Sequence, residues 1–99
     1  MLINISFDPT KDGTNQRKHG IPLSDAVALE WDTLVCKQDT RKDYGELRMI
    51  GYAMGGDRLF CVVFVDRPPQ APRERRIISL RKANNREITN YVHQASDNT

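Results

Sequence analysis

The sequence predicts an α+β domain, a small antiparallel β-sheet with two N-terminal helices and a C-terminal helix packed on it. Two observations favour this class. Strand-like segments fill most of the second half of the chain, and segments with helical spacing and helix caps stand outside this block. With 99 residues, 38% hydrophobic and 28% charged, the chain has the size and composition of one globular domain. We place this domain at 1–95 and expect residues 96–99 to form a frayed tail.

The first elements are a short strand over 2–7 and a helix that follows it. Asp8 predicts the helix start because its carboxylate can cap free N–H groups, and Pro9 fits the first helical position. Gly20 predicts the end, since glycine adopts the left-handed conformation that follows a last helical turn. Residues 10–19 contain no large apolar side chain. We therefore expect this helix to gain little stability from core packing, and to be present because of its contacts or its function.

A second helix is predicted after Ser24, which can cap it. Apolar residues recur at helical spacing from Leu23 to Trp31. We expect Trp31 to anchor the core of the domain, an interpretation that we favour over stacking on a base.

Four strands are predicted next, at 33–38, 47–54, 58–66 and 73–80. The second and third are joined by a glycine-rich tripeptide and predict a hairpin, and a proline-rich loop at 68–72 precedes the fourth.

The last helix begins near Asn84, which stands three residues before Glu87 in the spacing of a capping box. The helix carries an apolar stripe that we expect to lie on the sheet, formed by Ile88, Tyr91, Val92 and Ala95.

Positive charge is concentrated in one part of the chain. The net charge is only +2, but residues 67–86 hold seven Lys and Arg residues against one Glu, whereas residues 1–66 are slightly acidic. Such a local field attracts polyanions, of which nucleic acid is the most common. A solvated basic face without a partner is the alternative reading.

Part of this positive charge belongs to the strand predicted at 73–80, which would hold it on a rigid element. Strict alternation would place Arg73, Arg75, Ile77 and Ser79 on one face, and Arg76, Ile78 and Leu80 on the other. Arginine binds phosphate through a planar fork that is always charged. RNA cleavage by the 2′-hydroxyl builds negative charge on phosphoryl oxygens, which fixed cations stabilise.

His19, beside Lys18 at the end of the first helix, is a candidate general acid or base. A capping role is the alternative. We expect no metal site and no cofactor, because the sequence has no ligand spacing, phosphate-binding glycine loop or catalytic triad pattern. Cys36 and Cys61 are expected to be buried, unpaired side chains. The N-terminus has no signal-peptide pattern and no apolar run is long enough to span a bilayer, so we expect a cytoplasmic protein.

Two long motifs resemble the BrnT toxins of type II toxin–antitoxin systems. The resemblance covers roughly residues 4–92. The first motif comprises Phe7, Asp8, Pro9, Lys11, Asn15, Lys18, His19, Gly20 and Ile21. The second half of the chain supplies Arg48, Gly51, Arg58, Leu59, Val62 and Val63, followed by Arg76, Ile77, Ile78, Ser79, Arg81, Lys82, Ala83, Glu87 and Tyr91.

The chain departs from the family pattern at a few positions, with Phe7 where Trp is usual, Gly13 and Thr14 where alanines are common, and Asn84 in place of Thr or Ser. The loop at 68–72 is also longer than usual. None of these differences removes a basic site residue.

The resemblance implies a RelE-like fold and a metal-independent endoribonuclease of the mRNA interferase type. It also implies a BrnA-like DNA-binding antitoxin as partner in a hetero-oligomer. Combining the resemblance with the charge pattern, we expect catalytic roles for Arg76, Arg81, Lys82 and His19. Substrate-binding roles are expected for Lys18, Ser79, Arg75, Arg48 and Arg58. The alternative function is a non-catalytic nucleic-acid-binding or antitoxin-interaction module that acts as co-repressor.

Overall fold

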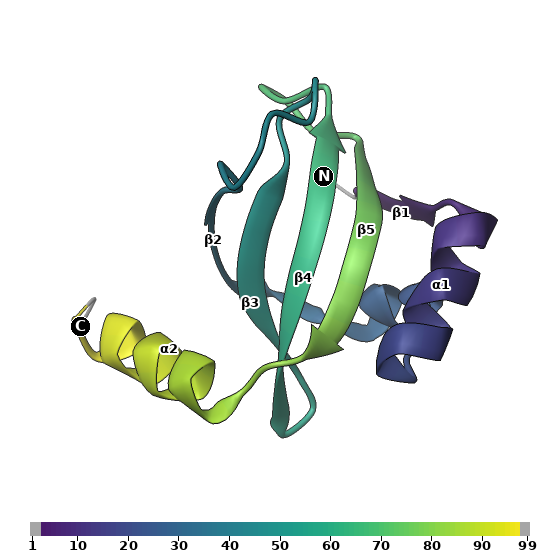
Figure 1. Ribbon diagram of the computed structural model, residues 1–99. Helices are drawn as coiled ribbons and strands as arrows, with labels where there is room; N and C mark the ends of the chain where they lie inside the picture. The colour runs from purple at the N-terminus through teal and green to yellow at the C-terminus, as the bar shows by residue number, and fades with distance from the viewer. Residues whose placement is uncertain (1–2, 98–99) are drawn as a thin grey trace.

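The computed structural model describes residues 3–97, which form one five-stranded sheet with helices at its edges and on one face (Figure 1). The elements in chain order are β1 (Asn4–Phe7), α1 (Pro9–His19), the 3-10 helix η1 (Leu23–Ala28), β2 (Glu30–Gln38), β3 (Met49–Gly55), β4 (Arg58–Arg67), β5 (Glu74–Lys82) and α2 (Asn85–Asp97). The strand order is β1-β5-β4-β3-β2. The α+β class is therefore confirmed.

The sheet is mixed, not purely antiparallel as predicted. β1 pairs with β5 in parallel, with Asn4 opposite Glu74 and Phe7 opposite Ile77, while all other neighbours are antiparallel. The chain leaves β1 through α1 and η1 and crosses one face of the sheet before it enters β2 at the far edge (Figure 1). A four-residue segment carries no local signal for a partner 70 positions away, so the sequence pattern did not reveal this pairing.

The core lies between the sheet and the α1–η1 segment, on the side that we call the inner face. Fully or almost fully buried side chains from both layers form it: Ile21, Leu23, Ala26 and Leu29 above the sheet, and Ala53, Val62, Phe64, Ile77 and Leu80 from the strands. Burying this apolar surface supplies the main stabilisation of the fold.

A β-bulge in β5 changes which side chains share a face. Ser79 lies opposite Val63 and Ile77 lies opposite Phe64, so Ile78 is an extra residue between two successive pairs. Both Ile77 and Leu80 therefore reach the core, although strict alternation had placed them on opposite faces. The prediction that Ser79 shares a face with Arg75 is wrong for the same reason.

The second predicted helix is only a 3-10 segment, and Trp31 lies in β2 instead. Pro22 precedes the segment without a side-chain cap, so Ser24 is not its cap. The role of Trp31 as core anchor is confirmed. Its ring packs edge-on against Phe64 with centroids 5.9 Å apart, and its indole N–H donates to the carbonyl of Ala26 at 3.0 Å.

Helix α1 has the predicted ends and an unexpected attachment. The Asp8 carboxylate accepts the N–H of Thr10 at 2.8 Å, and Gly20 has φ +73°. The buried Asn15 amide bonds to β5, accepting from the Leu80 N–H at 3.2 Å and donating to the Leu80 carbonyl at 2.9 Å. It also donates to the carbonyl of Ile21 at 2.8 Å. Asn15 thus occupies the edge of β5 beyond the point where β1 ends.

Helix α2 confirms the capping box but does not pack its apolar stripe on the sheet. Asn84 and Glu87 exchange hydrogen bonds of 2.8 and 2.9 Å. Ile88 is 39% exposed and Val92 is 53% exposed, and the helix extends away from the strands (Figure 1). Tyr91 ties it to β2 by donating to the carbonyl of Thr33 at 2.6 Å.

The predicted tail at 96–99 falls partly within α2, which reaches Asp97, and residues 98–99 lie outside the described residues. Cys61 is buried as expected, whereas Cys36 is exposed, and both are free thiols. No helix within residues 3–97 is long and apolar enough to cross a membrane.

Candidate nucleic-acid interface

The strand β5 presents three of the predicted site residues on the face opposite the core. Arg76, Ser79 and Arg81 lie opposite Val65, Val63 and Cys61, which are alternate positions of β4 and therefore share one face. Neighbouring strands continue this surface, which we call the outer face, with Ile50 and Tyr52 from β3 and Val35 and Lys37 from β2.

Arg81 is held by a carboxylate that leaves one edge of its guanidinium available. Its Nη1 and Nη2 donate to the two carboxylate oxygens of Glu87, both at 2.8 Å, and Nη1 also donates to the carbonyl of Lys82 at 3.3 Å. A guanidinium has five N–H donors. Within the described residues, the Nε–H and the second Nη2–H of Arg81 have no acceptor. These two donors lie parallel on one edge, which is the arrangement that binds phosphate bidentately.

Glu87 joins Arg81 to Tyr52. The Tyr52 hydroxyl donates to Glu87 Oε2 at 2.9 Å, the same oxygen that accepts from Arg81 Nη2. The hydrogen bonds from Arg81, opposed by partial burial and helped by the Asn84 N–H, lower the pKa of Glu87 from 4.5 to about 2. Glu87 is therefore a permanent anion at neutral pH and fixes the orientation of the Arg81 guanidinium.

We expect acid to destabilise the fold partly through Glu87. Its pKa is depressed in the folded chain, so its contribution is complete above pH 4.5 and is lost as the pH falls toward 2. Because the Arg81 side chain is 34% exposed, we expect only about 1–2 kcal/mol from this source. Denaturant unfolding of the wild type and of Glu87→Gln across this pH range measures the effect. An equally steep loss of stability in Glu87→Gln would contradict the assignment.

His19 is the last residue of α1. One turn earlier, Asn15 bonds to Leu80 near the C-terminal end of β5. Partial burial and the charges of Lys18 and Arg81 lower the pKa of His19 below 6.5. The imidazole is therefore neutral at pH 7 and can accept a proton. Lys18 is exposed beside it.

Arg76 occupies the outer face nearer the β1 edge. Its Nη2 lies 3.7 Å from Asp8 Oδ2, beyond hydrogen-bond distance, and its side chain is 31% exposed. The guanidinium of Arg76 is therefore partly accessible on the outer face, four β4 positions along the sheet from Arg81.

The remaining predicted residues are not gathered with these. Arg75 lies on the inner face, paired with Asp66 at 2.7 Å and stacked on Phe64 and Trp31 with its Cζ 4.5 and 4.8 Å from the ring centroids. These contacts make it part of the fold's interior. Lys82 lies opposite Phe60 on β4, on the face opposite Arg81.

Arg48 and Arg58 lie at opposite ends of the sheet. Arg48 precedes β3, stacks on Tyr44 at 4.2 Å and pairs with Glu46 at 3.3 Å. Arg58 is exposed at the hairpin, opposite Gly55.

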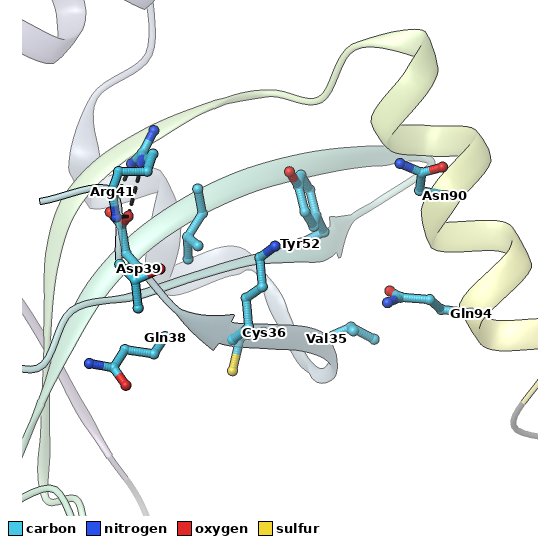
Figure 2. A pocket seen from close by; sticks show the side chains of 11 residues that line it. Val35, Cys36, Gln38, Asp39, Arg41, Tyr52, Asn90 and Gln94 are labelled. Carbon is cyan, nitrogen blue, oxygen red and sulfur yellow. Dashed lines mark hydrogen bonds and ion pairs between the residues drawn. The ribbon is translucent and has the colours of Figure 1, made fainter.

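Residues that the sequence did not single out complete the outer face. Asp39 is 5% exposed and binds Arg41, with bonds of 2.8 Å to its Nε and to its Nη2, and the Tyr44 hydroxyl at 3.1 Å. The Arg41 guanidinium holds the pKa of the Asp39 carboxyl well below its usual range. This cluster fixes the segment after β2 and sets Arg41 at the rim of a cavity of about 360 Å³ (Figure 2).

Tyr52 borders that cavity and, as described, contacts Glu87. The sequence offered Glu87 only as a helix cap and as part of the family motif. Its bond to Tyr52, 35 positions away, could not be predicted from either. The described residues contain no cluster of three His, Cys, Asp or Glu side chains that could hold a metal ion.

Comparison with known proteins supports the fold and identifies the family. A crystal structure of the Brucella abortus ribonuclease toxin BrnT is similar to the present fold, with a TM-score of 0.62 and 23% sequence identity over 85% of this chain and 100% of that chain. No curated protein matches the sequence at a significant level. The family model described as "Ribonuclease toxin, BrnT, of type II toxin-antitoxin system" matches residues 7–87. The chain therefore belongs to the BrnT family of ribonuclease toxins of type II toxin–antitoxin systems.

Proposed function

We propose that this chain is a metal-independent endoribonuclease that cleaves RNA on the outer face, and that this cleavage inhibits translation and growth. The observation that carries the proposal is the alignment of Arg76, Ser79 and Arg81 on one face of β5. His19 ends helix α1, which Asn15 bonds to β5 at Leu80, the residue before Arg81. Membership of a ribonuclease toxin family supports the reaction class.

In the proposed reaction, the neutral imidazole of His19 accepts the proton of an RNA 2′-hydroxyl. The 2′ oxygen attacks the adjacent phosphorus, the bond to the 5′ oxygen breaks, and that oxygen takes a proton from water. The free edge of Arg81 donates two hydrogen bonds to the phosphoryl oxygens, where negative charge grows in the transition state. Arg76 adds a second positive charge, Ser79 contributes a hydroxyl between them, and Lys18 attracts the RNA backbone.

Lys82, Arg48 and Arg58 have a smaller part in this proposal because they lie away from the row on β5, and Arg75 acts in the fold. The expected products are a 2′,3′-cyclic phosphate and a 5′-hydroxyl.

Incubating the purified chain with RNA in an excess of chelator tests the proposal. We expect cleavage at an undiminished rate, with cyclic phosphate at the new 3′ ends. Cleavage that requires a divalent metal, or products with 5′-phosphates, would rule out the proposed mechanism. RNA that is bound but left intact would favour the non-catalytic co-repressor function instead.

A toxin of a type II system implies an antitoxin. We propose a BrnA-like DNA-binding protein, which would form a hetero-oligomer with this chain in the cytoplasm. Co-purification with the product of the adjacent reading frame tests this partner.

A further inference from the structure

The outer face carries a cavity beside the row of basic residues on β5. The cavity of about 360 Å³ lies between strands β2 and β3 on one side and helix α2 on the other (Figure 2). This size lies within the roughly 300–1,000 Å³ range of small-ligand sites. Its strand-borne walls include Val35, Ile50 and Tyr52, which belong to the same face as Arg81.

The lining combines an apolar wall with hydrogen-bonding amides. Val35, Ile50 and the Tyr52 ring form the apolar part. Asn90 and Gln94 stand four residues apart on α2, so they lie on one face of the helix, and Figure 2 shows both side chains directed toward the cavity. Among the residues whose side chains the structure describes, neither amide has a hydrogen-bond partner. Each therefore has donors and an acceptor available to a ligand.

The cavity adjoins the proposed phosphate position. Tyr52, in its wall, shares the Glu87 Oε2 atom with Arg81 Nη2, so the Tyr52 hydroxyl and that nitrogen lie less than about 6 Å apart. Lys37 and Arg41 add positive charge at the rim. A nucleotide whose phosphate occupies the free edge of Arg81 would therefore have its base beside the cavity mouth.

We propose that this cavity binds the base of the nucleotide adjoining the cleaved phosphodiester and gives the enzyme its sequence preference. The inference rests on the proposed ribonuclease function. The base packs on the apolar wall, while Asn90 and Gln94 exchange hydrogen bonds with its edge, as amide side chains do with unstacked bases in single-stranded RNA. If the cavity were only a solvated groove, it would not discriminate between the four bases.

The first test measures binding without cleavage. Each of the four nucleoside 3′-monophosphates is titrated into the ¹⁵N-labelled chain and followed by NMR. We expect saturable shifts of the Asn90 and Gln94 side-chain amides, and of the Lys37 backbone amide, with at least one nucleotide. Shifts confined to β5 and the end of α1, with every nucleotide, would overturn the cavity assignment, whether or not the chain cleaves RNA.

The second test measures preference during cleavage. The variant Asn90→Ala/Gln94→Ala and the control Thr89→Ala/His93→Ala are incubated with an RNA pool of random sequence, and the cut sites are sequenced. The control pair has the same spacing on α2 but faces about 100° away from the cavity. We expect the first variant to lose about tenfold of the preference at one position beside the cut. The control should keep the preference.

An unchanged preference in Asn90→Ala/Gln94→Ala, or an equal loss in the control, would refute the assignment. Failure of the wild type to cleave any RNA would instead refute the proposed ribonuclease function. Since these changes affect exposed positions of α2, we expect all variants to fold.

Discussion

Replacement of Arg81 by alanine should slow RNA cleavage by on the order of 10²–10³-fold, the cost of losing an oriented donor to a developing oxyanion. The structure gives the reason. Glu87 holds two N–H groups of Arg81 and leaves a parallel pair for the phosphate. Single-turnover cleavage of a short RNA at saturating enzyme measures the chemical step directly. Arg81→Lys should recover only part of the rate, because an ammonium cannot present two parallel donors.

A matched control separates this role from general charge. Arg17 is an exposed arginine on α1, and its contact is a local bond of 3.3 Å to Thr14. Arg17→Ala removes the same charge and should change the rate by less than about threefold. Arg81→Ala also leaves Glu87 without its main partner, so thermal unfolding of Arg81→Ala and Arg81→Ala/Glu87→Gln should be measured alongside. A rate for folded Arg81→Ala close to that of the wild type would exclude Arg81 from the site.

The sequence predicted best those features that are encoded locally. The caps at Asp8, Gly20 and Asn84 depend on groups within four residues of each other, and the structure has all three. The hairpin of β3 and β4 likewise follows from its glycine-rich turn. Features that depend on distant partners were missed, including the parallel pairing of β1 and the bulge at Ile78.

The candidate site divides along the same line. Charge clustering and motif resemblance together selected Arg76, Ser79, Arg81 and His19, but could not determine which arginines lie on the outer face. Arg75 carries the same charge as Arg76, yet Asp66 and two aromatic rings hold it on the inner face. The bulge then returns Ser79 to the outer face. The role of Tyr52 could not be predicted from the sequence, because its hydrogen bond to Glu87 joins residues 35 positions apart.

Asn15 supports the second prediction with a large expected effect. Its amide serves two buried groups of Leu80 and the carbonyl of Ile21, with bonds between 2.8 and 3.2 Å. Asn15→Ala would leave these backbone groups without partners, each at a cost of about 1–3 kcal/mol, partly relieved where water enters. We therefore expect a loss of about 3–5 kcal/mol in the free energy of unfolding, measured by urea denaturation.

Two further variants identify the cause of that loss. Asn15→Leu keeps the branched shape and the number of heavy atoms of the side chain but removes every hydrogen bond, so it should be about as unstable as Asn15→Ala. Gln16→Ala removes a neighbouring amide that is exposed and donates to Asp12 at 3.2 Å, so it should change stability by less than about 0.5 kcal/mol. Wild-type stability in Asn15→Leu would show that packing, not hydrogen bonding, attaches α1.

The consequence of this attachment extends to the site. Asn15 is the buried residue of α1, so the helix has little apolar surface with which to hold its place on β5. His19 and Lys18 lie one turn after Asn15 on α1, so loosening the helix would change their position relative to β5. We therefore expect Asn15→Ala to show faster hydrogen exchange in α1 and to lose RNA cleavage even below its unfolding temperature. An unimpaired cleavage rate in a chain whose α1 exchanges freely would mean that His19 has no part in the reaction.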